Sequence, residues 1–400
     1  MSGASRQRAF LCLYSEPWET PLRTSKHHLM RHFARTSRVL YVEMPAHPAM
    51  ALAGDGRLRR ALRRTAAGPR EVGDNIFVLS PVVPLPYHAR APLFSGLWAN
   101  RLNQRVAFRS IRRALARLGM ERPVLWFYFP QGAVLLDDLP HALVCYHVVD
   151  DYLAFSGSPR SLSTVERALL TRADVVIASS ERLVDLKGPL APRIRLVRHG
   201  VDAASFRRAG PAPGDVAGLR RPVLGYFGAL HKLDLGLCLA LARKRAKWSF
   251  VFVGPVTGSQ GADVAVLSAA PNIHVLGPKP YEEIPAYLAA MDVAIMPFAV
   301  TPLTMAMSPI KVYEALAAGK PAVSTPIPEL AHFGPLVRTA TDADGFVDAV
   351  EAALSEPAAW ADRRRRFAEN NTWERRFDEI EALLAEALER KRRTGGDLGR

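Results

Sequence analysis

The segment with the clearest chemical potential covers residues 292–326, DVAIMPFAVTPLTMAMSPIKVYEALAAGKPAVSTP. An apolar run at 293–296 predicts a buried strand, and a loop of small residues separates it from a predicted helix. Ser308 is the expected N-cap of that helix and Pro309 its first residue. The free backbone N–H groups and the dipole at such a helix start favour an anion such as phosphate.

Two charged residues belong to the first turns of this helix. Lys311 can add a positive charge, and Glu314 lies about one turn further along, on roughly the same side. A carboxylate there can accept both hydroxyls of a ribose, as acidic residues do in dinucleotide sites. The alternative is an ordinary capped helix with a surface Lys–Glu pair, and the spacing alone does not decide between the two.

A second candidate for phosphate binding is the segment 224–234, in which a strand runs into Gly225 and Gly228 and then Lys232. Glycine lets the backbone approach a ligand closely, and Lys232 can meet a diphosphate. Gly254 ends a further strand in the same form. Since the spacing matches neither the P-loop nor the full dinucleotide pattern, a plain strand-to-helix turn is the alternative.

In the first half, Asp150 and Asp151 follow the apolar run 143–149. At the carboxyl end of a strand one of them can act as a base or bind substrate hydroxyls. A solvated turn that caps the next helix is the alternative. His28 is a third candidate for a catalytic residue.

Basic and aromatic residues also follow the first predicted strand, where Trp18 and Arg23 can hold an anionic acceptor or a donor phosphate. A solvated loop explains them equally well. His199 lies where the first half of the chain ends, and it either reaches the ligand or is structural. The sequence contains no H-E-x-x-H, Cys/His cluster or D-x-D-x-D run, so we expect no protein-bound metal.

These residues require a scaffold, and the sequence predicts an α/β one. Continuous apolar runs alternate with helical patterns, which indicates parallel sheets covered on both faces. A glycine- and proline-rich stretch at 206–221 predicts a linker between two doubly wound, Rossmann-like domains facing across a cleft, where ligands bind at the carboxyl ends of the strands. The expected domains are residues 1–205 and 222–370, followed by a helix at 371–390 and a tail at 391–400. The expected strands are residues 9–14, 39–43, 76–80, 124–129, 143–149, 175–179, 194–197, 223–227, 249–253, 273–276, 293–296 and 322–324.

The net charge of +15 makes nucleic acid, an anionic membrane or anionic ligands the candidate partners. Residues 1–120 hold 20 Lys and Arg against 6 acids, a balance of +14, whereas residues 251–350 hold 4 against 9, a balance of −5. Basic amphipathic patterns at 57–70 and 101–117 favour an anionic membrane surface, with a charged soluble helix as the alternative. No run is long enough to span a membrane, and no signal peptide is recognisable. We therefore expect a cytoplasmic protein, peripheral at the inner face of the membrane, and no nucleic-acid partner.

Taken together, these motifs resemble the GT-B glycosyltransferases, especially family-four-like bacterial enzymes of cell-surface polysaccharide synthesis. The resemblance covers about residues 8–388. It is carried in the second half by GYFGALHKLDL, FVFVGPV, NIHVLGPKPYEEIPAYLAAMDVAIMPF and SPIKVYEALAAGKPAVSTPIPEL. In the first half it is carried by YHVVDDY, ERALLTRADVVIASSERL and HGVDAASF, and near the end of the chain by NTWERRF.

The resemblance implies a nucleoside diphosphate sugar as donor (UDP, GDP or dTDP), a glycan or lipid-linked acceptor, and no cofactor. Glu314 would bind the ribose, and Lys232 would meet the diphosphate with backbone N–H groups near Ser308 and Ile310. Many relatives have a glutamate eight residues before the ribose glutamate, where this chain has Ala306. The donor sugar and the stereochemical outcome therefore stay open. The alternatives are a nucleotide-sugar 2-epimerase of the same fold and a basic nucleic-acid-binding protein.

Overall fold

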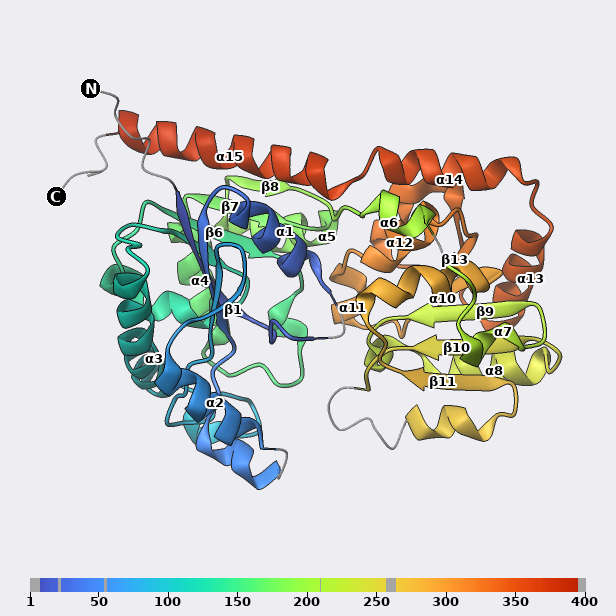
Figure 1. The fold of residues 1–400 in the computed structure, drawn as a ribbon, viewed down its shortest axis with the longest axis horizontal. Coiled ribbons are helices and arrows are strands. Elements are labelled where there is room, and N and C mark those ends of the chain that lie inside the picture. Colours follow the sequence, from blue (N-terminus) through green and yellow to red (C-terminus); the bar gives the residue numbers. More distant parts are fainter. Residues whose placement is uncertain (1–7, 21–22, 54–55, 209, 257–263, 395–400) are drawn as a thin grey trace. The chain divides into compact units, whose positions relative to one another are not determined.

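The computed structural model describes residues 8–20, 23–53, 56–208, 210–256 and 264–394 (Figure 1). The chain divides into two compact units, each built around one sheet. Unit 1 comprises residues 1–20, 26–197 and 377–400, and unit 2 comprises residues 21–25 and 198–376. None of the described helices is both long and apolar enough to cross a membrane.

The sheet of unit 1 has eight strands in the order β3-β4-β2-β1-β5-β6-β7-β8. Every neighbouring pair is parallel except β3 and β4. The strand order reverses between β1 and β5, which is where open α/β sheets bind ligands. The strands are β1 (Ala9–Ser15), β2 (Arg38–Glu43), β3 (Arg70–Gly73), β4 (Ile76–Leu79), β5 (Val124–Phe127), β6 (Leu143–Val148), β7 (Val175–Ala178) and β8 (Ile194–Leu196).

The helices of unit 1 include α3, a long helix with nine buried residues and a mostly charged outer side. The α-helices that fall mainly in this unit are α1 (Ser25–Ala34), α2 (Arg57–Ala67), α3 (Leu97–Arg117), α4 (Leu162–Arg172), α5 (Glu181–Lys187) and α15 (Trp373–Arg393). The 3-10 segments are η1 (Pro48–Ala53), η2 (Pro92–Phe94), η3 (Pro130–Asp138), η4 (Tyr152–Ala154) and η5 (Gly188–Leu190).

The sheet of unit 2 has six strands, all parallel, in the order β11-β10-β9-β12-β13-β14. Its order reverses between β9 and β12, so the chain crosses from β9 to β10 in one direction and from β12 to β13 in the other. Because such crossovers are right-handed, the connecting helices lie on opposite faces of the sheet. The strands are β9 (Val223–Phe227), β10 (Ser249–Val253), β11 (Ile273–Gly277), β12 (Val293–Met296), β13 (Ala322–Ser324) and β14 (Val337–Thr339).

The helices of unit 2 form two groups that match these crossovers. On one side α8 packs against α13, and on the other α12 packs against α6 and α14. The helices are α6 (Ala203–Arg207), α7 (Gly214–Ala217), α8 (Leu235–Lys244), α10 (Ile284–Ala290), α11 (Pro302–Ala306), α12 (Ile310–Ala317), α13 (Ala343–Leu354) and α14 (Ala359–Glu369). The 3-10 segments are η6 (Leu230–Lys232), η8 (Val266–Ala269), η9 (Tyr281–Glu283) and η10 (Pro328–Leu336).

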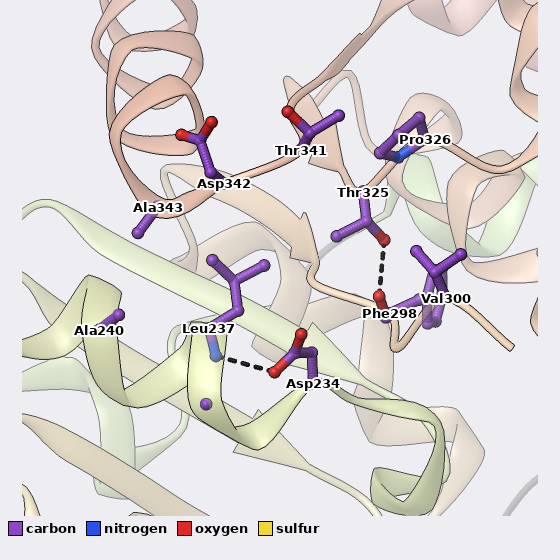
Figure 2. Close-up of a pocket in the computed structure, with 11 residues that line it drawn as sticks. Asp234, Leu237, Ala240, Phe298, Val300, Thr325, Pro326, Thr341, Asp342 and Ala343 are labelled. Carbon is purple, nitrogen blue, oxygen red and sulfur yellow. Dashed lines mark hydrogen bonds between the residues drawn. The ribbon is translucent and has the colours of Figure 1, made fainter.

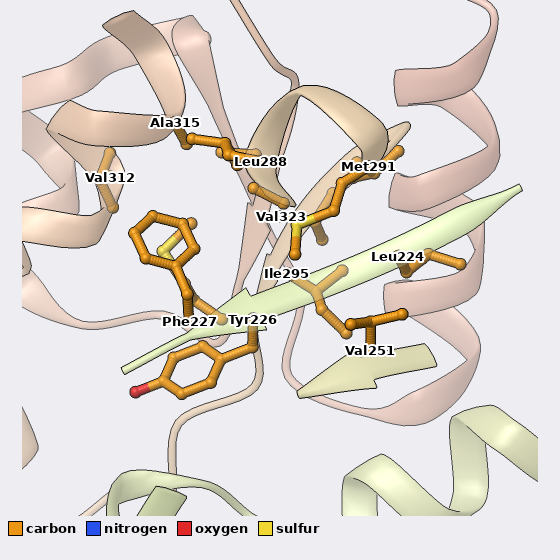
Figure 3. Packing of buried hydrophobic residues seen from close by; sticks show 14 of the residues in the cluster. Leu224, Tyr226, Phe227, Val251, Leu288, Met291, Ile295, Val312, Ala315 and Val323 are labelled. Carbon is orange, nitrogen blue, oxygen red and sulfur yellow. The ribbon is translucent and has the colours of Figure 1, made fainter. Parts of the chain in front are cut away.

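The core of unit 2 lies between its sheet and these helices (Figure 3). Leu224 and Ile295 come from the two strands at the reversal point, and Met291 packs over them from the end of α10. Gly225 on β9 leaves room for that methionine, since a Cβ there would lie 2.1 Å from Met291 Sδ. Close packing of this kind holds the ends of β9 and β12, and the loops that follow them, in a fixed position.

The expected strands are confirmed, while β3 and β14 were not expected. Both are short edge strands of three or four residues, in which little apolar periodicity can develop. The stretch expected as a linker contains α7, whose Val216 is buried.

Candidate functional site

The two segments that the sequence singles out in unit 2 meet at the point where the strand order reverses. The loop after β9 and the loop after β12 are joined by backbone hydrogen bonds from Asp234 N to Pro297 O (2.8 Å) and from Ala299 N to Lys232 O (2.9 Å). Residues of both loops are therefore held at the same edge of the sheet, where doubly wound proteins bind nucleotides.

Glu314 is the centre of the polar cluster at this edge. Its side chain is 1% exposed, and each carboxylate oxygen has a donor: Tyr281 Oη donates to Oε1 and Lys311 Nζ to Oε2, both at 3.0 Å. Burial raises the pKa of Glu314, while the charge of Lys311 and the two hydrogen bonds oppose the shift. The predicted proximity of Lys311 and Glu314 is thus observed, but the pair is largely buried and not a surface one.

Lys311 links Glu314 to the end of β9. Its Nζ lies 5.0 Å from the centre of the Phe227 ring, and its side chain is 17% exposed. A cation over an aromatic face is held in place while its charge stays available to a ligand. The lysine therefore supplies a fixed positive charge beside a carboxylate.

The expected capping of helix α12 is wrong in one respect. Pro309 is the N-cap, with extended ψ (98°), and Ile310 is the first helical residue. Ser308 thus precedes the cap, and its buried hydroxyl has no hydrogen-bond partner within the described part of the chain. Proline has no side-chain acceptor, so the first N–H groups of α12 are left uncapped by the N-cap residue. The helix start keeps its capacity to bind an anion.

Lys232 lies at the end of η6, close to the start of this region. Its Nζ is 3.9 Å from Met307 Sδ, which belongs to the loop between α11 and α12. The side chain is half-buried. Ala306, at the position where relatives have a glutamate, is buried at the end of α11.

Gly228 and Gly254 are in contact with each other. A Cβ on Gly254 would lie 1.8 Å from Gly228 O, and both residues have φ of +151°. The strand ends are joined by hydrogen bonds from Gly228 N to Val253 O (2.8 Å) and from Gly254 N to Gly277 O (2.9 Å). Sheet packing by itself thus accounts for both glycines, whether or not a ligand approaches them.

Tyr281 ends the segment 276–281, where the resemblance to GT-B enzymes implies the nucleotide base would lie; its contact with Glu314 was not predicted. Tyr281 begins η9, shortly after Gly277 at the end of β11. The glycine at the strand end is the sequence signal that places this segment at the carboxyl edge of the sheet. Burial and the neighbouring Glu314 raise the pKa of Tyr281, so its hydroxyl stays protonated as a donor. Arg23, which belongs to unit 2, lies 5.2 Å from the Tyr281 ring and pairs with Glu282.

A pocket of about 350 Å³ opens at the same sheet edge, between the starts of α8 and α13 (Figure 2). Asp234 and Asp342 cap these helices, accepting from Leu237 N and Gly345 N at 2.9 Å. Thr325 lies between them and donates to Phe298 O. Both helix starts thus carry a carboxylate as side-chain cap, whose negative charge disfavours a bound anion. The α12 start, on the other face of the sheet, differs in this respect.

His199 lies in unit 2, where it is buried. Its ring centre is 6.0 Å from that of Trp373, and its carbonyl accepts a hydrogen bond from Arg376 Nε (3.3 Å). Gly200 beside it leaves no room for a side chain, since a Cβ there would lie 2.6 Å from Trp373 N. These contacts give His199 a packing role at the start of α15.

In unit 1 the two predicted aspartates have different surroundings. Asp151 Oδ1 accepts from Lys187 Nζ (2.9 Å), and the same lysine donates to Glu166 Oε2 (2.9 Å). Tyr146 Oη completes this cluster by donating to Glu166 Oε1 (2.7 Å). Burial would lower the pKa of Lys187, but the two carboxylates raise it. Asp151 is therefore held by a buried lysine.

Asp150 interacts electrostatically with Lys26, one of the basic residues after the first strand that the sequence offers as candidates for holding an anionic acceptor or a donor phosphate. Lys26 Nζ is 2.6 Å from Glu16 Oε2 and 5.4 Å from the Tyr128 ring centre. Burial opposes the charge of Lys26, whereas Glu16 and Asp150 raise its pKa. His28 is half-buried on α1, next to His27, whose pKa burial lowers to about 4. Glu16, Lys26 and Asp150 thus form an ionic group at the carboxyl ends of β1 and β6.

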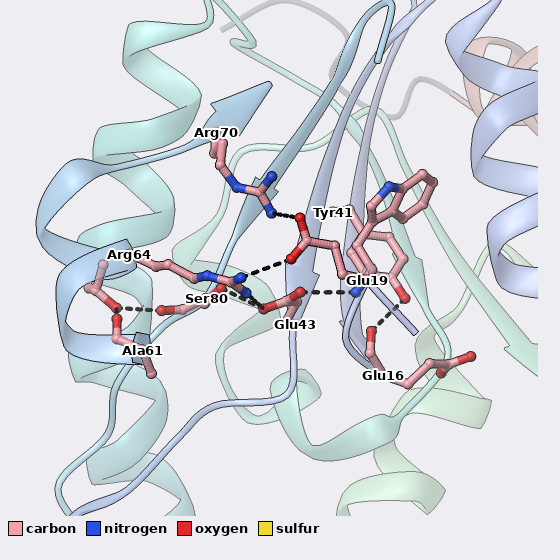
Figure 4. A network of polar contacts seen from close by, with 10 residues as sticks. Glu16, Glu19, Tyr41, Glu43, Ala61, Arg64, Arg70 and Ser80 are labelled. Carbon is pink, nitrogen blue, oxygen red and sulfur yellow. Dashed lines mark hydrogen bonds and ion pairs between the residues drawn. The ribbon is translucent and has the colours of Figure 1, made fainter. Parts of the chain in front are cut away.

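Trp18 is 8% exposed and belongs to the packing of unit 1. Its backbone N–H donates to Glu43 Oε1 (2.9 Å). Its ring centre lies 5.0 Å from that of Tyr41 and 5.2 Å from the guanidinium carbon of Arg31. Figure 4 shows the surrounding network, in which Glu19 pairs with Arg64 and Arg70. The structure thus gives Trp18 an interior position, next to the chain that leads to α1.

His147 lies behind these residues on β6. Neither of its ring nitrogens has a hydrogen-bond partner among the residues that the structure describes, and burial lowers its pKa to about 3. Over the same residues, no group of three or more His, Cys, Asp or Glu side chains is arranged to hold a metal ion.

Residues 221–356 match the family described as glycosyl transferases group 1. Over 282 residues the chain is 30% identical to TuaH of Bacillus subtilis (strain 168), a protein assigned to teichuronic acid biosynthesis as a glycosyltransferase. This match covers 65% of the chain and 71% of TuaH.

Solved glycosyltransferase structures share the fold. Sucrose-phosphate synthase from Thermosynechococcus elongatus superposes with a TM-score of 0.69 at 14% identity, covering 95% of this chain and 99% of the other. HepE of Anabaena, solved with UDP-glucose, gives a TM-score of 0.65 at 16% identity and covers 94% and 99%. With two Rossmann-like units and this sequence match, the chain belongs to the group 1 glycosyl transferases and is a glycosyltransferase of the GT-B fold.

Proposed function

We propose that the donor is a nucleoside diphosphate sugar bound at the β9–β12 edge of unit 2. The observation that carries this proposal is the Glu314 carboxylate, fixed by Tyr281 and Lys311 beside an uncapped helix start. A ribose hydroxyl pair would exchange for part of this hydrogen bonding, and the phosphates would lie at the start of α12. HepE, which has the same fold, was solved with UDP-glucose.

Positive charge near the phosphates would stabilise the leaving diphosphate. Lys232 and Lys311 lie near the loop before α12, and the N–H groups of Ile310 and its neighbours add the helix dipole. Such preorganised charge is the largest single contribution in many enzymes. The proposed transfer therefore needs no metal ion, with Arg23 as a further cation beside Tyr281.

Titration calorimetry with UDP, GDP and dTDP tests the donor site. We expect one of the three to bind, and Glu314→Ala to weaken that binding about tenfold to a hundredfold, since hydrogen bonds to charged groups contribute about 1.5–3 kcal/mol. Glu283→Ala is the matched control, because Glu283 is an exposed acid on η9 and should bind as the wild type does. No binding of any of the three, or unchanged affinity in Glu314→Ala, would contradict the assignment.

The acceptor is proposed to be a hydroxyl of a glycan or lipid-linked saccharide of the cell surface, bound by unit 1. The similarity to TuaH supports this class of acceptor. Asp150 is the preferred base over Asp151, because Lys187 already holds Asp151 in a buried cluster. If the reaction inverts, Asp150 would take the acceptor proton; if it retains, a donor phosphate oxygen would do so.

We also place the enzyme in the cytoplasm, at the inner face of the membrane. Leu93 (78% exposed) and Trp98 (56% exposed) stand out from η2 and α3, next to the exposed arginines Arg101 and Arg105. Apolar side chains flanked by arginine suit an anionic interface. Binding to anionic but not neutral vesicles, weakened by salt and by Trp98→Ser, is the expected result. Equal binding to neutral vesicles would contradict it.

A further inference from the structure

A second pocket, of about 540 Å³, lies in unit 1 at the opposite edge of its sheet from Asp150. It is formed where β1, β2, β5 and β6 begin, and the end of α15 completes it. The amino ends of parallel strands seldom form the substrate site of a doubly wound fold, since ligands bind at the carboxyl ends. The pocket is lined by Arg8, Ala9, Arg38, Gly119, Met120, Glu121, Arg122, Ala142, Leu388 and Arg392.

Four arginines from distant parts of the chain converge on this pocket, which we call the arginine pocket. Two of them are held by backbone carbonyls: Arg38 Nη1 donates to Leu118 O (2.6 Å) and Arg122 Nη2 to His141 O (3.4 Å). A carbonyl orients a guanidinium without neutralising its charge. These two arginines are therefore positioned as well as charged.

Acidic residues offset only part of this charge. Arg8 pairs with Glu381 (2.8 Å), and Glu121 is the acidic residue of the lining. Among the residues that the structure describes here, the four arginines outnumber these two acids, so the lining of the pocket is basic. Like charges brought together repel, so an anion that binds among them is favoured. The planar guanidinium fork matches the oxygens of phosphate in particular.

We propose that the arginine pocket binds a phosphate-bearing anion, either a soluble phosphate compound or a phospholipid headgroup. The site is separate from the donor and acceptor sites proposed above and does not depend on them. Because Leu388 and Arg392 belong to α15, the bound anion would also tie the end of this helix to the sheet of unit 1.

Titration of the full-length protein with sodium pyrophosphate at constant ionic strength tests this site. The variant Arg38→Gln/Arg392→Gln should bind pyrophosphate at least about tenfold more weakly than the wild type. The matched control is Arg112→Gln/Arg113→Gln, which removes two exposed arginines of α3 outside the pocket and should leave the affinity unchanged. The single variant Arg392→Gln should show a smaller loss and leaves the Arg38–Leu118 contact intact. Equal affinity in wild type and pocket variants, or no binding by the wild type, would overturn the proposal.

Vesicles separate the two sources of phosphate. If the ligand is a lipid headgroup, the wild type should bind phosphatidylcholine vesicles that contain phosphatidic acid more tightly than the pocket variant does, and pyrophosphate should displace it. If the ligand is soluble, the two proteins should bind these vesicles equally while differing in pyrophosphate affinity. Either pattern supports the site.

Discussion

The two units each bury a lysine among acceptors, but in opposite arrangements. In unit 1, Lys187 stands between Asp151 and Glu166, and Tyr146 completes the hydrogen bonding of Glu166. In unit 2 the carboxylate is central: Glu314 accepts from Lys311 and Tyr281. Lys187 is 6% exposed and Lys311 is 17% exposed.

We interpret the difference as one between a cluster that stabilises the fold and the proposed donor-binding cluster. The Lys187 cluster joins α4, α5 and the end of β6, and its charges satisfy one another. The Glu314 cluster lies beside a helix start with no side-chain cap, and its lysine is close to an aromatic ring at a strand end. A buried charge with closed hydrogen bonding holds a fold together, whereas one beside unsatisfied donors is suited to a ligand.

The largest effect is expected from Lys187→Met. It leaves two carboxylates close together in the interior without their cation, so we expect the free energy of unfolding to fall by about 3–5 kcal/mol. Urea unfolding at neutral pH measures this. The control Lys244→Met removes an exposed lysine paired with Asp344 and should cost under about 1 kcal/mol. Equal losses in the two variants would remove the distinction between the clusters.

Lys311→Met should impair nucleotide binding more clearly than it lowers the free energy of unfolding. Burial already raises the pKa of Glu314, so without Lys311 the carboxyl group can take up a proton, which limits the loss of stability to about 1–2 kcal/mol. Nucleotide affinity should nevertheless fall about tenfold, because a fixed cation near the phosphates is lost. Calorimetry and urea unfolding on the same preparation measure both quantities. A large loss of stability with unchanged affinity would assign this pair to the scaffold.

At neutral pH, the smallest effect concerns His147, a polar group of unit 1 that lies outside the closed cluster. Burial lowers its pKa from 6.5 to about 3, so between these values the unfolded chain binds more protons than the folded one. Stability should therefore fall as the pH drops below 6.5, by at most about 1.4 kcal/mol per pH unit from this residue. His147→Phe should unfold with a shallower pH dependence. Identical slopes over this range would show that His147 contributes nothing to acid sensitivity.

The sequence predicted most strands because each buried strand is a continuous apolar run, and it placed Lys311 beside Glu314 because helical spacing is local. It did not predict that Tyr281 reaches Glu314, 33 residues away, or that Lys187 joins Asp151 and Glu166, since these contacts depend on tertiary packing. The cap of α12 was misplaced by one residue because Pro309 adopts extended ψ, which the fixed φ of proline equally permits.

The contact between Gly228 and Gly254 has a consequence for genetics. In a library of all single substitutions selected for activity, both positions should tolerate almost no replacement, because any side chain on Gly254 would meet the carbonyl of Gly228. That intolerance would look like the mark of donor binding, yet sheet packing alone produces it. Positions such as Lys311, where we expect a substitution to spare the fold and weaken binding, are the ones from which selection can reveal the donor.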